Sequence, residues 1–357
     1  MTEMQLRRDG AEYITAQIAA GVANGTRMAT ITGNWTMARA VRIPGDFTLI
    51  LDGCYLQMAE GSFDNMFVNE RHDTDIGRTT VGTDRKIRIL GRNGAVLDGG
   101  VYNGLSEQNH LKDGRPPIWK NNLILFTNVD GFEISGLHCR NQRWWALNFI
   151  YCGNGHLHEL DFCACDIGID RNGQVYHGLK HSWYKEILVK NADGIDIRQG
   201  CHDIVIENIT GFTEDDSVAI TGLDWVMERH FAVTEMCSDI CRITVKNVAT
   251  AALCANVRML NQGGIKLHDV LVENVTDTSL DSPHMERGGY GVRIGDKGLY
   301  GARHAIADET YHITIRNVRS RGKDGAVGLA GAMRDVCIEN ITAFAGAVVM
   351  EDLRTEK

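Results

Sequence analysis

A short motif that recurs along the second half of the chain constrains its fold more than any other feature. It is a β-branched run ending in a charged residue, followed by Asn and then Ile or Val, as in IVIENIT at 204–210 and VCIENIT at 336–342. Each copy is followed by a second short apolar run, such as VRM at 257–259 and VRI at 292–294. The motif asparagines stand at positions 208, 247, 274, 317 and 340. Their separations of 39, 27, 43 and 23 residues indicate a unit of about 23–25 residues with insertions in some copies, which is a period typical of solenoids.

These repeated segments predict stacked strands. Val and Ile alternate in them without a helical period, a pattern that favours strands. A unit of two or three short strands cannot bury its own apolar face, but stacked units bury it together and pair their strands in parallel. We therefore predict an all-β fold, a right-handed parallel β-helix that forms a single domain over residues 1–357. The recurring Asn fits a tight turn in which side-chain amides bond along the stack.

The N-terminal segment AEYITAQIAAGVANG, residues 11–25, reads as a helix and not as a strand. Ile14, Ile18 and Val22 fall on one helical face, and Gly25 follows as a C-terminal cap. We expect this helix to cover the open end of the first coil, because unpaired strand edges promote aggregation.

Charge and composition exclude several classes of protein. A net charge of −9 argues against a basic nucleic-acid-binding protein. No apolar run reaches about 18 residues, so we predict no membrane span. The N-terminus MTEMQLRRDG lacks the apolar region of a signal peptide; we expect a cytoplasmic location, and secretion stays open. The ten cysteines occur mainly in strand-like runs, which favours buried reduced thiols, and no His/Cys set has the spacing of a zinc site.

Three aspartates concentrate the chemistry that can be read from the chain. Asp215 and Asp216 follow Asp193 by 22 and 23 residues, which is close to one coil. Equivalent positions on neighbouring coils lie about 4.8 Å apart, so the three carboxylates should converge. Close carboxylates push one pKa up and leave another low, which suits an acid and base pair in glycoside hydrolysis. A surface charge run and a Ca²⁺ site are the alternatives.

The same segments resemble glycoside hydrolase family 28, the polygalacturonase-like enzymes. NADGIDIRQGCHDIVIENIT, residues 191–210, is similar to that family's Asn-Thr-Asp-Gly-Ile-Asp segment, and TEDDSVAIT, residues 213–221, to its Asp-Asp-Cys-Val-Ala-Ile segment. GAVLDGG at 94–100, the stretch 115–160 and YGVRIG at 290–295 extend the resemblance over most of the chain. It implies a pectin-lyase-like parallel β-helix and an inverting hydrolase of pectin-derived or related glycans that contain uronic acid or galactose.

The resemblance also implies roles for individual residues. Asp215 would be the general acid that protonates the leaving oxygen. Asp193 and Asp216 would orient and deprotonate the attacking water, and Asn191 would position Asp193. Arg293 would hold a substrate carboxylate or hydroxyl, which suits a planar fork of donors. An inverting mechanism requires room for water between acid and base. No metal or organic cofactor is implied.

Two departures from the family pattern concern the substrate. The family usually has a Gly-His-Gly segment on the coil after the paired aspartates, but AALCANVRML at 251–260 contains no histidine. The lysine expected two residues after Arg293 is replaced by Gly295, and Lys297 is a candidate substitute from a shifted position. These changes weigh against plain polygalacturonate as the substrate. Rhamnogalacturonan hydrolases of the same family also lack the histidine, so its absence is compatible with hydrolysis.

Three insertions interrupt the repeat near the aspartates, at about 167–186, 222–240 and 281–289. Loops on a rigid scaffold often carry binding residues, and aromatic rings can stack on sugars. Loops on both sides of the aspartates would close a substrate groove into a pocket, and a pocket favours exo-action on oligosaccharides. For each aromatic residue, packing of its loop onto the coils is the alternative. The substrate-binding candidates in these loops and beside the aspartates are His181, Trp183, Trp225, His230 and Arg198.

Two other functions compete with hydrolysis. A polysaccharide lyase can also be built on a parallel β-helix, and the aspartates could then bind Ca²⁺. A non-catalytic carbohydrate-binding β-helix could retain the aspartates without turnover. In every case the expected partner is an oligosaccharide or polysaccharide, without nucleic acid or membrane. The sequence alone leaves the sugar, the linkage and the oligomeric state undetermined.

Overall fold

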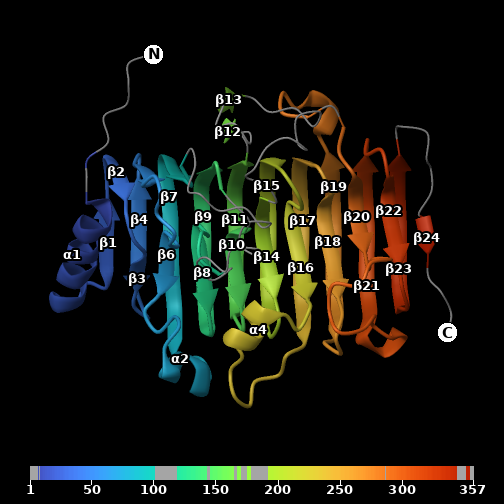
Figure 1. Cartoon of the computed structure of the whole chain (residues 1–357), viewed down its shortest axis with the longest axis horizontal. Coiled ribbons are helices and arrows are strands. Elements are labelled where there is room, and N and C mark those ends of the chain that lie inside the picture. Colours follow the sequence, from blue (N-terminus) through green and yellow to red (C-terminus); the bar gives the residue numbers. More distant parts are fainter. Residues whose placement is uncertain are drawn as a thin grey trace.

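The computed structural model describes residues 7, 9–100, 119–142, 145–164, 167–169, 175–177, 192–285, 287–343 and 351–353. Its strands form two long sheets in which successive coils pair in parallel (Figure 1). Sheet A contains β1 (Met28–Ile31), β2 (Asn34–Met37), β4 (Thr48–Asp52), β5 (Tyr55–Met58), β7 (Asp84–Asp98), β9 (Val129–Arg140), β11 (Gly153–Cys163), β15 (His202–Thr213), β17 (Ile240–Ala252), β19 (Leu267–Asp277), β21 (Thr310–Ser320) and β23 (Arg334–Ala343). Sheet B contains β3 (Val41–Ile43), β6 (Phe67–Asn69), β8 (Ile124–Thr127), β10 (Trp145–Ile150), β14 (Asp193–Arg198), β16 (Val218–Gly222), β18 (Ala255–Asn261), β20 (Tyr290–Ile294), β22 (Gly325–Ala330) and β24 (Glu351–Leu353).

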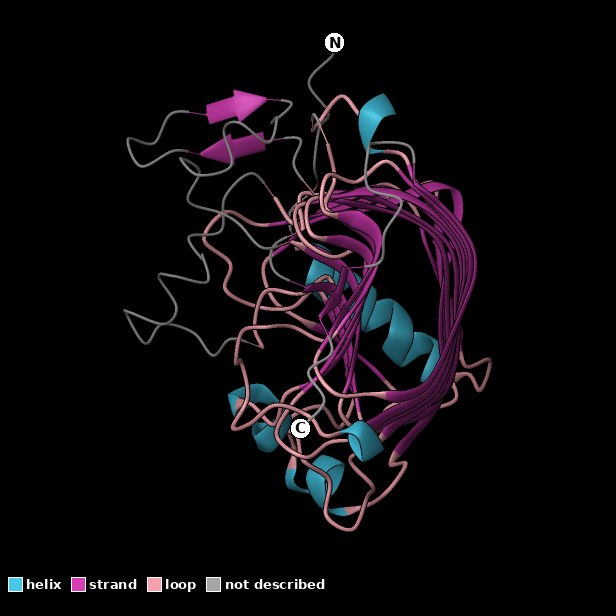
Figure 2. Ribbon diagram, turned by 90° about the vertical axis from the view of Figure 1, so that its right-hand side faces the viewer, coloured by secondary structure: helices cyan, strands magenta, loops and turns pink. Residues whose placement is uncertain are grey.

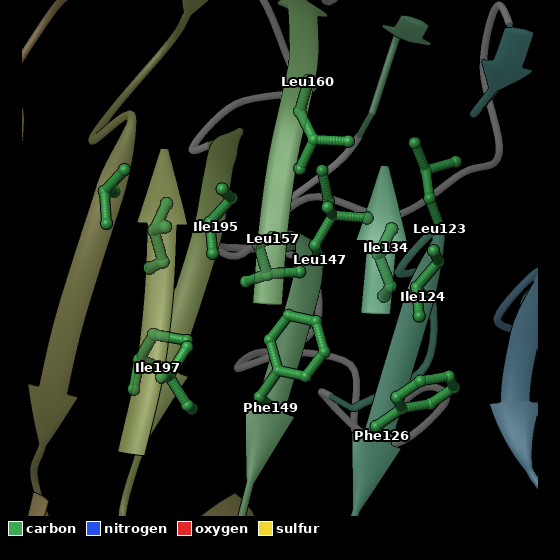
Figure 3. Close-up of a cluster of buried hydrophobic side chains, with 14 of the residues drawn as sticks. Leu123, Ile124, Phe126, Ile134, Leu147, Phe149, Leu157, Leu160, Ile195 and Ile197 are labelled. Atoms are coloured by element: carbon green, nitrogen blue, oxygen red, sulfur yellow. The ribbon is translucent and has the colours of Figure 1, made fainter. Parts of the chain in front are cut away.

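The two sheets enclose one continuous apolar core, and this arrangement is a parallel β-helix, as predicted. Viewed along the long axis in Figure 2, sheet A forms a curved wall that faces sheet B. Leu147 and Phe149 of β10 pair in register with Ile195 and Ile197 of β14, and Figure 3 shows these side chains pointing into the shared interior. All four are fully buried. Burying such a side chain contributes about 1.5–3 kcal/mol, so the stacking that the repeat predicted is what stabilises each coil.

The motif asparagines form a ladder on the outer surface, which confirms the role predicted for them. The side-chain amide of Asn247 donates to Asn208 Oδ1 at 3.0 Å, Asn274 donates to Asn247 at 3.0 Å, Asn317 to Asn274 at 3.0 Å and Asn340 to Asn317 at 3.1 Å. Each of these five residues has a φ between 51° and 58°. Asn tolerates this left-handed conformation better than β-branched residues do, so the ladder marks a bend in each of β15, β17, β19, β21 and β23.

The helix expected at the N-terminus is present as α1 (Gly10–Ala23) and packs against the first strands of both sheets. Ile14 and Ile18 are buried, and Gly25 ends the helix in the left-handed conformation with φ 77°. Val22 is 37% exposed, so the prediction that it belongs to the buried face is wrong. Gly21 takes its place because a Cβ there would lie 2.5 Å from Met28 O, which brings the last turn of the helix close to β1.

The cysteines and the helices agree with two further expectations. The nine described cysteines are free thiols, and five of them are buried, as the strand-like surroundings predicted. Among the described residues, no helix combines the length and the apolar character needed to cross a membrane.

The insertions emerge at both ends of the coils. Between β11 and β14, the short strands β12 (Ile167–Ile169) and β13 (Val175–His177) pair antiparallel. The 3₁₀ turn η2 (Ser279–Asp281) follows β19, and η3 (Ala307–Glu309) precedes β21. Helix α4 (Val226–His230) lies between β16 and β17, and α2 (Asp75–Thr79) between β6 and β7. Figure 1 shows α2 and α4 at the ends of the coils opposite to β12 and β13.

Candidate active site

The structure brings the three predicted aspartates together at the beginning of neighbouring strands of sheet B. Asp193 opens β14, and Asp215 and Asp216 are separated from the start of β16 by Ser217 alone. The backbone N–H of Asp216 donates to Asp193 Oδ1 at 2.8 Å, and the N–H of Gly194 donates to the Asp216 carbonyl at 3.0 Å. A separation of one coil in the sequence therefore becomes direct contact, as the repeat predicted.

Gly194 is the residue that directs Asp193 outward. A Cβ at Gly194 would lie 2.4 Å from Ser217 O and 3.4 Å from Cε2 of the core residue Phe162, so position 194 faces the interior and admits no side chain. Ile195 and Ile197 also face the core. The remaining positions of β14, which are Asp193, Asp196 and Arg198, consequently lie on the outer face of sheet B.

Asp196 is a fourth acidic residue of the cluster, and our sequence analysis missed it. It is 1% exposed, and its pKa is raised to about 7, above all by burial, while Arg198 lowers the pKa and Asp216 and Glu228 raise it. The signal was present in the DGID segment, because two apolar residues that face inward leave the position between them facing outward.

The environments of Asp193 and Asp216 differ in the sign of the charges around them. Burial raises the pKa of Asp193 well above its ordinary value, and Asp196, Asp215 and Asp216 raise it further. Burial also raises the pKa of Asp216, but Arg258, a hydrogen bond from Cys254, and Arg293 oppose the shift. Asp216 is therefore easier to ionise than Asp193, and a difference of this kind between neighbouring carboxyls is what acid–base catalysis uses.

Two arginines continue the site on the next coils. Arg258 of β18 and Arg293 of β20 are register partners, and both contact Asp296, at 2.7 and 2.9 Å respectively. The Arg258 side chain is 6% exposed and that of Arg293 is 23% exposed, so Arg293 is the one within reach of a ligand. The pKa of Asp296 is lowered although burial opposes this, because the Gly298 N–H and Arg258 stabilise the carboxylate.

Arg258 was also missed at the sequence level, although the chain carried a signal for it. VRM at 257–259 and VRI at 292–294 are the same pattern on neighbouring coils, and the pairing of Val257 with Val292 places their arginines side by side. Only the resemblance to the family had selected Arg293, and nothing in that pattern pointed to the preceding coil.

Arg198, a predicted substrate-binding residue, lies beneath the surface of the site. Its guanidinium donates to Asn148 Oδ1 at 3.1 Å, to Glu228 Oε1 at 3.0 Å and to Asp196 Oδ1 at 3.0 Å, and it stacks 4.0 Å from the Trp145 ring centroid. The side chain is 3% exposed. These contacts fit a supporting role better than contact with a substrate, because each guanidinium nitrogen already donates to a protein group.

Aromatic residues pack the loop that contains α4 against the rest of the protein. The His230 ring contacts Asp73 Oδ1 at 2.7 Å and stacks on Trp119 with ring centroids 4.0 Å apart. Trp225 is half-buried against the apolar cluster on the outer face of sheet B that includes Trp145. For Trp225 and His230 this geometry matches the packing alternative. Lys297 is exposed in the loop after Asp296, and Asn191, His181 and Trp183 lie outside the described residues.

Cys254 occupies the coil on which the expected histidine is missing. Its N–H donates to the Asp215 carbonyl at 3.4 Å, and the possible ligand atoms of Asp215, Asp216 and Cys254 lie within 4.8 Å of one another. Burial, then Asp216 and Asp215, raise the thiol pKa far above its ordinary value. Metals bind the thiolate, and Arg258 and Arg293 are close, so this set fits a hydrogen-bonded thiol better than a metal centre.

A cavity of about 370 Å³ lies at the ends of sheet A strands and is separate from the aspartates. Its walls include Arg140, Asp161, Phe212 and His284, and none of the four aspartates of the cluster lines it. We place the site at the carboxylates because titratable groups from adjacent coils meet there in opposed electrostatic surroundings.

Comparisons with known proteins bear on the family and the fold. The model of glycosyl hydrolases family 28 matches residues 58–234. The exopolygalacturonase of Thermotoga maritima is similar in fold, with a TM-score of 0.50, 11% identity, and coverage of 94% of this chain and 77% of that chain. A mutant tailspike protein of E. coli bacteriophage HK620, in complex with a pentasaccharide, gives a TM-score of 0.61 and 13% identity over 99% of this chain.

These likenesses differ in what they support. The present chain spans 62% of the tailspike chain, and at such low identity the two solved structures show the parallel β-helix alone. No curated protein matches the sequence. The family match is more informative, because the matched residues 58–234 include Asp193, Asp215 and Asp216. It confirms the resemblance to glycosyl hydrolases family 28 over residues 58–234 and supports a glycoside hydrolase.

Proposed function

We propose that this protein is an inverting glycoside hydrolase that acts on the chain ends of pectin-derived or related oligosaccharides containing uronic acid or galactose. One observation carries the proposal. Carboxylates from adjacent coils form one cluster, in which Asp193 is surrounded by other carboxylates whereas Asp216 faces Arg258 and Arg293. Such opposed surroundings make Asp216 easier to ionise than its neighbour Asp193, which suits Asp216 to act as the base.

The exposure of the aspartates supports a division of labour. Asp215 is half-buried, whereas Asp193 and Asp216 are 6% and 8% exposed. Asp215 is therefore the most accessible of the three to a glycosidic oxygen and protonates it as the leaving group departs. Asp216, aided by Asp193, takes a proton from the water that attacks the opposite face of the sugar.

The two arginines favour a substrate with a carboxylate. Arg258 is nearly buried, whereas the Arg293 side chain is 23% exposed although both contact Asp296. Arg293 can therefore turn part of its guanidinium toward a ligand, and a guanidinium binds a carboxylate in a bidentate geometry. A uronic acid residue next to the cleaved bond fits this arrangement better than a neutral sugar does.

The covered face of sheet B supports action at a chain end. Met227 and Phe231, from α4 and the residue after it, pack onto Val68, Leu125 and Trp145, which point outward from β6, β8 and β10. Glu228 of the same helix is fully buried and bonded to Arg198 at 3.0 Å. The strands that precede β14 are thus covered by protein, so a bound glycan extends toward β18 and β20 and ends near the aspartates.

Product analysis tests this function. We would incubate the protein with galacturonan and rhamnogalacturonan oligosaccharides and follow reducing ends, ultraviolet absorbance and, by nuclear magnetic resonance, the anomer released first. We expect new reducing ends without absorbance, an inverted anomer, and a short product of one length from the earliest times. Absorbance from unsaturated products would instead identify a lyase, and a ladder of product lengths would contradict exo-action.

Asp215→Asn is the matched variant for this test. General acid catalysis typically contributes 10²–10⁴-fold, so we expect kcat to fall by about that factor while affinity for the oligosaccharide persists. If the wild-type protein binds the oligosaccharide but releases no product, and Asp215→Asn binds equally well, the protein is a carbohydrate-binding β-helix and the proposed hydrolysis is wrong.

A further inference from the structure

The coil after the paired aspartates presents a thiol to Asp216. Cys254 directly precedes β18, and its backbone is held on both sides: its N–H donates to the Asp215 carbonyl at 3.4 Å, and its carbonyl accepts from the Tyr290 N–H at 2.7 Å. Its side chain is half-buried, hydrogen-bonded to Asp216, and close to Asp215 as well. The position of the thiol is therefore set by two neighbouring coils.

The same coil presents a cation. The Arg258 guanidinium donates to the Gly295 carbonyl at 2.8 Å and to Asp296 Oδ2 at 2.7 Å. Gly295 has φ 72°, and a Cβ there would lie 1.6 Å from Ala330 O, so the backbone that anchors Arg258 can be built only with glycine. Asp296 is in turn held by the Gly298 N–H at 2.9 Å. These contacts keep a nearly buried positive charge on the row that pairs Asp196 with Ala219 and Ala219 with Arg258, from where it lowers the pKa of Asp216.

We propose that Cys254 and Arg258 are positioning residues for Asp216, in which the thiol donates a hydrogen bond to the carboxylate and the guanidinium keeps it ionised as the base. This inference rests on the proposed hydrolysis, and it assigns a role to two residues for which the sequence carried none. It also explains how the site operates without a histidine on this coil, because a protonated thiol supplies the donor.

The charges around Asp216 show why both groups are needed. When they are ionised, Asp193 and Asp196 of β14 and the adjacent Asp215 favour protonation of Asp216, as its burial does. The groups that oppose them are Arg258, Cys254 and Arg293. Loss of one opposing group therefore raises the pKa of Asp216. The thiol is suited to donate because burial and the two carboxylates raise its own pKa and keep its proton in place.

The pH dependence of hydrolysis provides the first test. We would measure kcat/KM against pH for the wild type, Cys254→Ala, Cys254→Ser, Arg258→Gln and Arg258→Lys. The base must be ionised, so a raised pKa of Asp216 moves the low-pH side of the kcat/KM profile, its acidic limb, to higher pH. We expect the Ala and Gln variants to move it upward by about one pH unit. The Ser and Lys variants, which keep the donor and the charge, should remain near the wild type. A purely structural role would lower the rate without moving the limb.

Alkylation of Cys254 provides a second test that requires no turnover. The rate with iodoacetamide follows the thiolate fraction, and peptide mass spectrometry reports it for each cysteine. Asp216→Asn removes a charge that raises the thiol pKa, so labelling of Cys254 should become about tenfold faster for each pH unit by which that pKa falls. Arg258→Gln should slow it. The exposed Cys237 and Cys337 serve as internal standards whose rates should not change.

The two measurements separate this inference from the proposed function. If no glycan is cleaved, the hydrolase proposal is wrong, and the labelling rates alone decide whether Cys254 and Arg258 are coupled to Asp216. The inference is overturned if labelling of Cys254 is unaffected by Asp216→Asn. It is equally overturned if the acidic limbs of all four variants coincide with that of the wild type. Circular dichroism confirms that each variant is folded before either comparison.

Discussion

Asp193 illustrates at the level of one residue how a catalytic arrangement reduces stability. Its folded-state pKa is raised by burial and by three neighbouring carboxylates, whereas an unfolded Asp titrates near 3.9. The folded state therefore binds more protons than the unfolded state between these two pKa values. Stability must fall as the pH rises through that window, and the loss persists at higher pH.

Asp193→Asn should consequently stabilise the protein while it inactivates the site. The amide oxygen can still accept the hydrogen bond from the Asp216 N–H, but the charge is gone. At pH 8 we expect the free energy of unfolding to rise by about 0.5–2 kcal/mol, with a smaller gain at pH 4. Urea unfolding at both pH values measures this difference. A variant that is less stable than the wild type at pH 8 would show that Asp193 is not electrostatically strained.

Asn247 tests the asparagine ladder at the same scale. It donates to Asn208 and accepts from Asn274, each at 3.0 Å, with φ 55°. Asn247→Ala removes both bonds, each worth about 0.5–1.5 kcal/mol, and adds about 1–2 kcal/mol of left-handed strain. Asn247→Gly removes the bonds without that strain. In thermal and urea unfolding we expect the stability of Asn247→Gly to lie between those of Asn247→Ala and the wild type. Equal losses of stability in the two variants would argue against left-handed strain at this position.

Helix α4 shows how an element is fixed to the scaffold by a buried charge. Arg198 connects Asp196 of its own strand with Glu228 of α4, and the side chains of all three are at most 3% exposed. Removing one partner of a buried ion pair leaves the other charges without compensation, which typically costs about 3–5 kcal/mol. The helix that covers the outer face of sheet B is therefore an integral part of the site.

Arg198→Met should lower the free energy of unfolding by about 3–5 kcal/mol and increase hydrogen exchange in residues 223–239. Arg229→Met on the same helix is the matched control, because its contact with Asp224 at 3.6 Å is exposed and such pairs contribute at most about 1 kcal/mol. Similar losses in both variants would mean that the buried charges do not hold α4 in place.

The whole molecule depends on its first coil being closed. Sheet A begins at β1 and sheet B at β3, and α1 lies against both, with Ile14 fully buried. Without this cover the interior side chains of the first strands would meet water, and their edges would be open to pairing with another chain. Closure by α1 thus bears on solubility as much as on stability.

Ile14→Asp should open this end of the molecule. Truncating a buried Ile already costs about 2–5 kcal/mol, and a buried carboxylate adds to that loss. We expect a lower unfolding midpoint and the appearance of oligomers in size-exclusion chromatography. Val22→Asp changes an exposed position of the same helix and should remain monodisperse under identical conditions. Oligomers in both variants would assign the effect to charge and not to the loss of the cap.

The sequence by itself determined the features that follow from a period. The recurring Asn motif specified coils, strand direction and the ladder, and the spacing of 22 and 23 residues from Asp193 to Asp215 and Asp216 specified their convergence. The helix that precedes the first strand could also be predicted, because the spacing of its apolar residues is a property of one short segment. Each of these depends only on positions at a fixed separation along one chain.

Only the tertiary structure decided which charged groups surround the site and which residues cover it. It buried Arg198 between Asp196 and Glu228, stacked His230 on Trp119, and set Cys254 and Arg258 beside Asp216. These partners come from different coils and from insertions, whose paths no period fixes. A pKa depends on burial and on charges brought together from distant positions, so the roles of these residues became visible only once the coils were stacked.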